Sequence, residues 1–478
     1  MTIGRNARMC LGVLVVLLGM CASATAQTND EIFPNFQWNF STPGARANAM
    51  GRAFIGMADD ASATVSNPAG LVSLTKPQFY VEYKNTNLKV DRLSAVNSYV
   101  SLVPTTFSSS INALSFFTIS MPFKDRFAIG LTRHQFLNYK ENFTLAARAI
   151  PSDPDNEATF PVNGNTDATG TVYGLTFSAA LSDKVDVGVT LGINQLSVNS
   201  VATRFAIVFG PGYVGGNHND LASSPIINNQ TSINQSNTAA SIGFGLLVKP
   251  SEKVSIGFNF AQGPQFTVQE NEQLNNGSNT ACFTNTSCGV NSSLTQYAAP
   301  AGFAAFPRTV HVNVPNRIGV GIAARPTPRW LFAMDLVYIN YSTLANHFTL
   351  IFDDSEPVGS LNKPGLTGAE FAMDNVTEAH FGAEYNLTTG KNPIFVRAGV
   401  FTNPDHRVKF TGFSSSALPS NIVQDVVATY NAQYNLLPRS GETRGTIGAG
   451  IALGEQLQLD LAYVFGKEFV ASTAFRFK

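Results

Sequence analysis

Apolar residues alternate with small or polar residues over several stretches of roughly 9 to 12 positions. One stretch, 184–194, has an apolar side chain at every second position: Val185, Val187, Val189, Leu191 and Ile193. A period of two is that of a β-strand, and about ten residues suffice for a tilted strand to cross a membrane. The opposite face carries mostly Gly, Ala, Ser, Thr and Asn, whereas the solvent face of a soluble sandwich would carry more charge. The pattern therefore favours a membrane barrel over a soluble β-sandwich.

Fourteen segments show this alternation, at 77–90, 111–122, 125–138, 170–181, 184–199, 238–249, 253–268, 315–325, 328–341, 376–387, 393–402, 443–453, 456–466 and 470–478. An even number is what a bacterial single-chain barrel requires. Every second connection is tight, and those between are mostly longer, as expected of periplasmic turns and extracellular loops. We therefore predict an all-β fold, a transmembrane antiparallel β-barrel of about 14 strands that spans residues 76–478.

The first 26 residues are typical of a secretory signal peptide. Arg5 and Arg8 precede an apolar run at 11–20, and Ala24-Thr25-Ala26 supplies small residues at the expected cleavage site. We expect the mature chain to begin at Gln27. Later in the chain there is no run of about 18 apolar residues that could form a transmembrane helix, so a membrane-embedded chain must cross as a closed barrel.

Such a barrel is too wide to be filled by its own side chains. Fourteen strands about 4.8 Å apart and tilted by about 40° give a backbone diameter of about 28 Å. We predict that residues 27–75 form a plug, or hatch, inside the lumen. Its charged residues can pair with polar walls, its glycines permit close turns, and Asn-Pro favours a turn. The candidate plug residues are Arg46, Gly51, Arg52, Asp59, Asp60, Asn67 and Pro68.

Composition and motifs argue against most catalytic and nucleic-acid functions. Only 13% of the 478 residues are charged, about half of the ~25% usual in soluble domains. The 31 basic and 32 acidic residues nearly cancel, so no nucleic-acid partner is expected. The six His residues are dispersed, which predicts no metal site and no cofactor. No G-x-S-x-G elbow occurs, and we predict that the protein is not an enzyme. The main enzymatic alternative is an outer-membrane phospholipase. Cys282 and Cys288 could form a loop disulfide, and the sequence does not decide this.

Three basic residues, Arg317, Arg325 and Arg397, fall on the inward, small-polar faces of their strands. They could hold the carboxylate of a ligand. Three acidic residues share those faces on neighbouring strands: Asp335, Glu378 and Glu384. A salt-bridge network across the lumen is therefore the simpler hypothesis.

The segment 125–138 breaks its own alternation. Continuing the outward series would direct Arg133 and Gln135 to lipid, which costs ~2–4 kcal/mol for a charge near the midplane and ~0–1 kcal/mol near the interface. Either these residues lie at the outer rim, or the strand bulges and turns them inward.

Two long outer loops carry apolar clusters. The third, about 200–237, contains Phe205 and Phe209, and the fourth, about 269–314, contains Phe303 and Phe306. Apolar residues at the mouth suit the capture of a hydrophobic ligand, whereas the loops of a water-filled porin are normally polar. The alternative is that these loops pack on each other or extend the strands.

Three strings in the plug segment carry a family resemblance: Gly51-Arg52-Ala53, Ala58-Asp59-Asp60-Ala61 and Asn67-Pro68-Ala69. They resemble the N-terminal hatch of the FadL-like long-chain fatty acid and hydrocarbon transporters of the outer membrane (OMPP1/FadL/TodX). The resemblance implies a 14-stranded barrel with an internal hatch in the outer membrane of a Gram-negative bacterium. It also implies an inward kink in the third strand that makes a lateral exit.

The predicted function is passive uptake of hydrophobic compounds, most simply long-chain fatty acids or hydrocarbons. Its partners are then a hydrophobic small molecule and outer-membrane lipid. The alternative function is a general diffusion porin, or a structural barrel that presents its loops to a partner.

Overall fold

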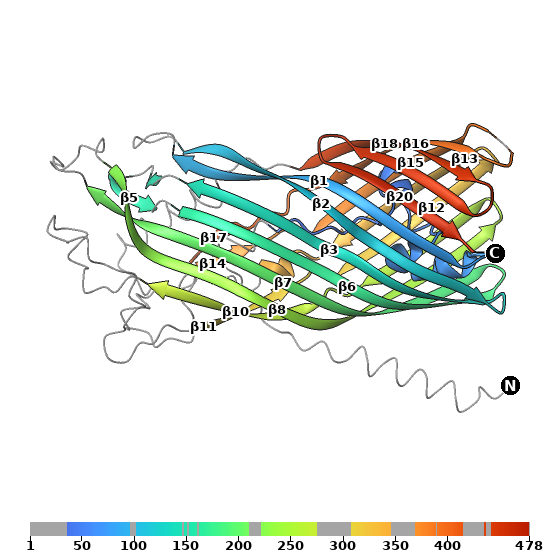
Figure 1. Cartoon of the computed structure of the whole chain (residues 1–478), viewed down its shortest axis with the longest axis horizontal. Coiled ribbons are helices and arrows are strands. Elements are labelled where there is room, and N and C mark those ends of the chain that lie inside the picture. The colour runs from blue at the N-terminus through green and yellow to red at the C-terminus, as the bar shows by residue number, and fades with distance from the viewer. Residues whose placement is uncertain are drawn as a thin grey trace, which may run out of the picture.

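The computed structural model describes residues 36–95, 102–145, 148–150, 153–159, 162–209, 221–274, 307–345, 369–388, 390–413, 435 and 441–477. Within them, one antiparallel sheet winds into a closed barrel of 14 strands, as the sequence predicts (Figure 1). Each strand pairs with its neighbours in the chain, β1 pairs with β20, and β8 pairs with β9, so the sheet has no free edge at the level of these pairings.

Twelve barrel strands are continuous: β1 (Gln78–Ala95), β2 (Leu102–Phe123), β3 (Phe127–Leu145), β6 (Val162–Ser182), β7 (Val185–Phe209), β8 (Leu221–Ser251), β13 (Trp330–Ile339), β15 (Val376–Asn386), β16 (Ile394–Asn403), β18 (Glu442–Leu453), β19 (Leu457–Val464) and β20 (Glu468–Arg476). Two are interrupted, and each consists of two pieces: β9 (Val254–Ala261) with β10 (Gln265–Leu274), and β11 (Pro307–Asn313) with β12 (Arg317–Thr327).

Smaller elements lie outside the barrel sheet. The strands β4 (Arg148–Ile150) and β5 (Asp153–Thr159) pair with each other, as do β14 (Ala369–Ala372) and β17 (Lys409–Phe413). The helical elements are α2 (Ala45–Ala49), α3 (Ala63–Ser66), η2 (Pro68–Ser73) and α4 (Ser342–Ala345). Among the residues described, no helix has the length and hydropathy needed to span a membrane.

Several strands continue well past their predicted outer ends. β2 begins at 102 instead of 111, β7 runs to 209 instead of 199, and β8 begins at 221 instead of 238. The predicted third outer loop is therefore wrong in large part, because most of it is a β7–β8 hairpin in which Phe205 pairs with Ile227. In these outer parts the strict alternation of apolar and polar residues is lost while the backbone pairing persists.

The outer surface carries a continuous band of exposed apolar side chains. Leu131, Leu181 and Ile193 are each more than 60% exposed, which is unfavourable in water and expected against lipid. Aromatic rings gather near the ends of this band, as where Trp330 stacks on Phe332 and contacts Tyr385. The barrel thus has the surface of an outer-membrane protein.

The short turns gather at the end of the barrel where the C-terminus lies (Figure 1). Lys124 and Asp125 both have positive φ in the β2–β3 turn, and Gly454 has φ of 61° in the β18–β19 turn. Such angles are those of tight hairpins whose twist matches that of the strands. The strand ends that lead into the longer connections lie at the opposite end, in agreement with the predicted alternation of turns and loops.

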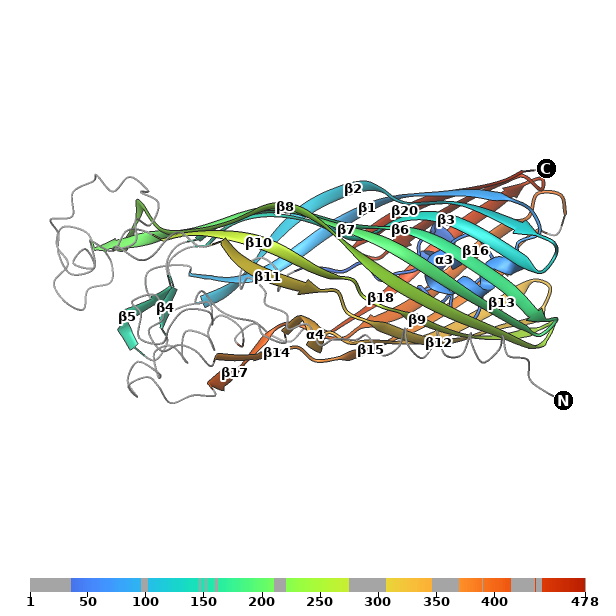
Figure 2. The same cartoon turned by 90° about the horizontal axis from the view of Figure 1, so that it is seen from below.

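The segment before β1 lies inside the barrel, where Figures 1 and 2 show it in dark blue. The helix α2 contacts β16, β18, β19 and β20, while η2 contacts β2, β3, β6, β7 and β8. Together these short elements touch the walls on both sides of the lumen.

Candidate functional site

Glycines on both sides let the plug backbone press directly against the barrel wall. A Cβ atom at Gly51, which has φ of 62°, would lie 2.3 Å from the carbonyl oxygen of Phe381. On the wall, a Cβ at Gly399 would lie 2.2 Å from the amide nitrogen of Gly51, and one at Gly382 would lie 2.2 Å from the carbonyl oxygen of Met50. The small residues on the inward face thus make room for main chain rather than for water.

A chain of ion pairs joins the plug to the wall. The Arg46 guanidinium lies 2.6 Å from Asp59 and 2.9 Å from Glu384 of β15. Glu384 is also 2.6 Å from Arg397 of β16, and Arg325 of β12 lies 2.6 Å from Asp59. Arg397 and Arg325 therefore belong to a salt-bridge network, which is the simpler of the two sequence hypotheses for them.

Hydrogen bonds fix the rest of the plug. Asp335 of β13 accepts the backbone N–H groups of Phe54 at 2.6 Å and Ile55 at 2.8 Å. Asn67 caps η2 by accepting the N–H of Ala69 at 3.2 Å, and it donates to the carbonyl oxygen of Ile55 at 2.9 Å.

The other predicted plug residues also make contacts. Pro68 is the first residue of η2 and is buried, as its fixed φ allows. Asp60 accepts the Ser62 hydroxyl at 2.6 Å. Arg52 lies 3.4 Å from Glu468 and stacks over Phe401 at 4.0 Å from the ring centroid.

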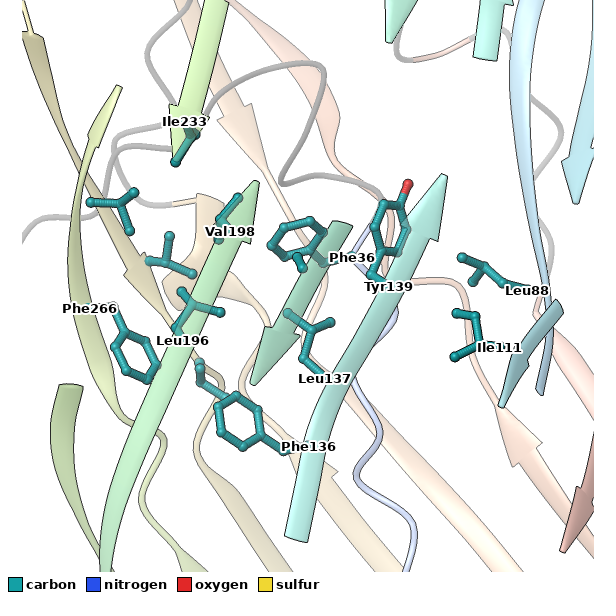
Figure 3. Close-up of a cluster of buried hydrophobic side chains, with 14 of the residues drawn as sticks. Phe36, Leu88, Ile111, Phe136, Leu137, Tyr139, Leu196, Val198, Ile233 and Phe266 are labelled. Atoms are coloured by element: carbon teal, nitrogen blue, oxygen red, sulfur yellow. The ribbon is translucent and has the colours of Figure 1, made fainter. Parts of the chain in front are cut away.

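Above the plug, part of the lumen is filled by a large buried apolar cluster, which we call the throat (Figure 3). Its side chains come from eight barrel strands and from the start of the described chain. The members are Phe36, Leu88, Val90, Ile111, Phe136, Leu137, Tyr139, Ala168, Leu196, Val198, Ile233, Phe266, Val268, Val312 and Val314. An inward-facing apolar wall is the opposite of a water-filled pore, whose lumen is polar.

The residues 36–40 cross the throat and close it. Trp38 forms an antiparallel bridge with Leu137 of β3, and the N–H of Asn39 donates to the carbonyl oxygen of Phe136 at 2.7 Å. Trp38 also stacks on Phe136 and on Phe40, each with ring centroids 6.3 Å apart. This segment therefore acts as a short extra strand along β3.

A row of six aromatic rings crosses the lumen at this level. It runs from β10 through β3 and the segment 36–40 to the residues 404–408, in the order Phe266, Phe136, Trp38, Phe40, Tyr341 and His406. The first pair has centroids 6.4 Å apart and the last pair 4.0 Å. Burial lowers the pKa of His406, which favours the uncharged ring that stacks on Tyr341.

Strand β3 shifts register at the throat. Its ladder with β6 has a bulge between Gln135 and Leu137, after which the inward series changes from even to odd positions. On the other edge, pairing with β2 ends at Phe116 and His134, although both strands continue. Above this point no backbone pairing joins β2 to β3 in the described structure, and we call this interruption of the ladder the window. The Ser109 hydroxyl donates to the carbonyl oxygen of Lys140 across it, the rings of Phe107 and Phe143 pack with centroids 6.1 Å apart, and Asn39 lies along its β3 side.

Arg133 and Gln135 precede this bulge and keep the outward phase. Arg133 lies opposite Tyr173 in the ladder, and its guanidinium donates to the carbonyl oxygen of Leu114 at 2.6 Å. The bulge lies just beyond these two residues, at Phe136, and their part in a lateral exit stays a prediction.

Arg317 differs from the other lumenal arginines. Within the described residues, no carboxylate lies within 4 Å of it. Its guanidinium stacks over Phe40 at 4.4 Å and donates to the carbonyl oxygen of Phe40 at 3.3 Å. The Arg317 charge thus lies beside the segment that closes the throat.

A cavity of about 410 Å³ lies beside the segment 36–40, on the side of β1 and β20. Its wall includes Lys84, Tyr341, Glu378, His406 and Lys467. Among the described residues, no three His, Cys, Asp or Glu side chains gather as a metal site.

Several predicted residues lie outside what the structure describes. These are Phe303, Phe306, Cys282, Cys288 and the signal peptide, and for Phe205 and Phe209 only the strand pairing is described. Sequence reasoning missed the throat itself. Two signals point to it: the alternating Phe36, Trp38 and Phe40, and the adjacent Phe136 and Leu137, which break the period of β3.

Solved structures of similar fold include a FadL homologue, a toluene transporter and a monoaromatic hydrocarbon channel. A Pseudomonas aeruginosa FadL homologue matches 95% of this chain and 100% of its own, with a TM-score of 0.54 and 13% identity. The Ralstonia pickettii toluene transporter TbuX matches 92% of this chain and 100% of its own, with a TM-score of 0.53 and 12% identity. The monoaromatic hydrocarbon channel CymD matches 92% of this chain and 99% of its own, with a TM-score of 0.52 and 13% identity. No curated protein matched the chain.

At these identities the structural likeness concerns the fold alone. A family model described as outer membrane protein transport protein (OMPP1/FadL/TodX) matches residues 36–403, which include the plug, the throat and most of the barrel. Because that match covers well over half of the sequence, the chain belongs to the OMPP1/FadL/TodX family of outer-membrane transport proteins.

Proposed function

We propose that this protein carries hydrophobic compounds across the outer membrane by passive diffusion. The observation that supports this most directly is the throat, an apolar passage inside the barrel that is closed by side chains rather than by a charged constriction. A general diffusion porin needs a hydrated lumen, so an apolar throat disfavours that alternative.

The proposed route begins at the outer mouth and ends at the side of the barrel. A ligand enters among the long loops, where capture by Phe205, Phe209, Phe303 and Phe306 remains a prediction. It displaces the segment 36–40 from the throat and leaves through the window between β2 and β3. The plug bars the direct way to the periplasm, because ion pairs and buried hydrogen bonds tie it to the wall on several sides.

The proposed cargo is long-chain fatty acids or hydrocarbons. Relatives of similar fold include a toluene transporter and a monoaromatic hydrocarbon channel. A carboxylate-bearing ligand is favoured by Arg317, which has no carboxylate within 4 Å among the described residues and lies beside Phe40. Charge-assisted hydrogen bonds to a carboxylate would replace its single bond to the Phe40 carbonyl.

Placing polar groups in the throat tests the transport route. We expect Leu196→Asn with Val198→Asn to lower the uptake rate of a long-chain fatty acid about tenfold, since losing ~1.4 kcal/mol of apolar contact costs a factor of ten. Entry of a small hydrophilic solute should not fall. The matched control is Val201→Asn, which lies on the exposed face of the same strand. Equal loss in the control, or an unchanged rate in the double variant with normal heat-modifiable mobility, would contradict the route.

Neutralising Arg317 tests the class of cargo. We expect Arg317→Met to weaken the uptake of a long-chain fatty acid at least threefold while a neutral alkane of equal length enters at the wild-type rate. The change keeps a long apolar side chain beside Phe40, so packing is disturbed little. Arg325→Met is the control, because Arg325 already pairs with Asp59. A parallel fall for both ligands would assign Arg317 to structure and leave neutral hydrocarbons as the favoured cargo.

A further inference from the structure

On the edge that faces β9 and β10, the backbone pairing of β8 is interrupted in the middle of the strand, while its pairing with β7 continues. It pairs with β9 as far as Gly243 and Ala261, and it pairs with β10 again from Ser232 and Asn271. Between these points, the backbone hydrogen bond that spans the two strands in the described structure runs from Gln262 N–H to the carbonyl oxygen of Ile242, at 2.9 Å. We call the gap between residues 233–242 and 262–270 the seam.

The sequence of the interruption accounts for the seam. Pro264 has no N–H to give to β8. A Cβ at Gly263 would lie 1.7 Å from the carbonyl oxygen of Val314, so only glycine allows this approach. The N–H of Val314 donates to the carbonyl oxygen of Pro264 at 3.0 Å, and the N–H of Gly263 donates to the side chain of Asn316 at 2.8 Å. The two interrupted strands thus bend together and bond to each other instead of to β8.

Beyond the bend, β10 lies on the lumen side of β8 (Figure 2). Asn237, on the less exposed face of β8, donates through its side-chain amide to the carbonyl oxygen of Thr267. The side-chain oxygen of Gln235 accepts the N–H of Gln269 at 2.8 Å. Phe266 reaches across the lumen to stack on Phe136 of β3. In the described structure, two side-chain hydrogen bonds therefore span the upper part of the seam.

A cavity of about 90 Å³ connects the seam with the closed throat. On the seam side its wall includes Ile242 and Phe260, and on the inner side it includes Phe40 and Phe136 from the row of rings. On the outer surface, Ile242 and Phe244 are 38% and 43% exposed. The lower end of the seam therefore meets the apolar band that faces lipid.

We infer that the seam is a second side portal, through which a hydrophobic molecule passes from the throat to the outer leaflet. This inference rests on the proposed function. It adds a second route next to β8, which β6 and β7 separate from β3 and the window. Opening the seam breaks the side-chain hydrogen bonds and the one backbone hydrogen bond from Gln262 to Ile242. It leaves the ladders above and below intact. The chemistry of its wall suits an uncharged hydrocarbon chain.

A reversible cross-link across the seam tests the portal in the full-length protein in lipid vesicles. Cysteines at Asn237 and Thr267 are joined by a short bis-thiosulfonate reagent, and uptake of a long-chain fatty acid and of an alkane is measured before and after reduction. The matched control joins Ser232→Cys and Asn271→Cys, register partners on the same two strands where the ladder is closed. We expect at least a twofold slower uptake in the joined seam variant, restored by reductant, and no change in the control.

An unchanged rate in the joined seam variant would overturn the portal. Failure of both variants to take up either ligand before cross-linking, with normal barrel mobility, would refute hydrophobic transport itself. If the seam variant does not fold, photolabelling of the unmodified protein with a diazirine-bearing alkane decides. Adducts at Ile242 or Phe260 in addition to the throat support the portal. Adducts in the throat without any at these residues overturn it.

Discussion

Deleting residues 36–71 is expected to raise the single-channel conductance of the protein in a planar bilayer at least severalfold. These residues supply the plug and the segment 36–40, which together fill a lumen about 28 Å across at the backbone. Without them, the inward faces of β15, β16 and β18 would border water through small residues such as Gly382, Gly399 and Gly448. The wall would then resemble that of a diffusion pore.

The variant that lacks residues 36–71 must be shown to be folded before its conductance is interpreted. Heat-modifiable mobility on gels and proteolytic resistance of the barrel serve this purpose, since the strand ladders do not depend on the plug for closure. A folded barrel with wild-type conductance would contradict the plug assignment for residues 27–75. It would mean that the throat or the loops seal the passage.

The barrel could be predicted from the sequence because a membrane imposes the period of two on every strand that crosses it. Val185 to Ile193 and Leu457 to Leu461 both alternate, and both form membrane-facing stretches of β7 and β19. The period does not report how far pairing continues above the lipid, so the sequence alone places the ends of β2, β7 and β8 too close to the membrane. Backbone hydrogen bonds hold those extensions whichever side chains they carry.

Contacts inside the lumen are harder to predict because they join residues far apart in the sequence. The pattern indicated that Arg397 and Glu384 share an inward face, and they are 2.6 Å apart. It could not pair Arg46 with Glu384, 338 positions away, since that contact depends on where the plug lies. The bulge at Phe136 shows the same limit. One irregular residue shifts the phase of β3, and its consequence, the row of stacked rings, involves four other segments.

Removing the charge of Arg397 is expected to cost more stability than any other single substitution in the ion-pair network. Its side chain is 0% exposed and contacts Glu384 and Asp460, each at 2.6 Å. In Arg397→Met the two carboxylates lose this partner while Asp460 stays buried, and breaking a buried pair in this way typically costs ~3–5 kcal/mol. Glu384 keeps its contact with Arg46, so the loss should fall mainly on Asp460 and loosen the wall between β16 and β19.

Arg325→Met provides the matched control for this prediction. Arg325 also pairs with a carboxylate at 2.6 Å, but its side chain is 39% exposed and that of Asp59 is 29% exposed. An exposed pair contributes ~0–1 kcal/mol, so the free energy of unfolding should fall little. Urea titration of the folded, heat-modifiable form in lipid vesicles measures both variants. If they lose the same stability, burial does not set the strength of this network, and the plug is anchored instead by the close contacts of Gly51, Gly382 and Gly399.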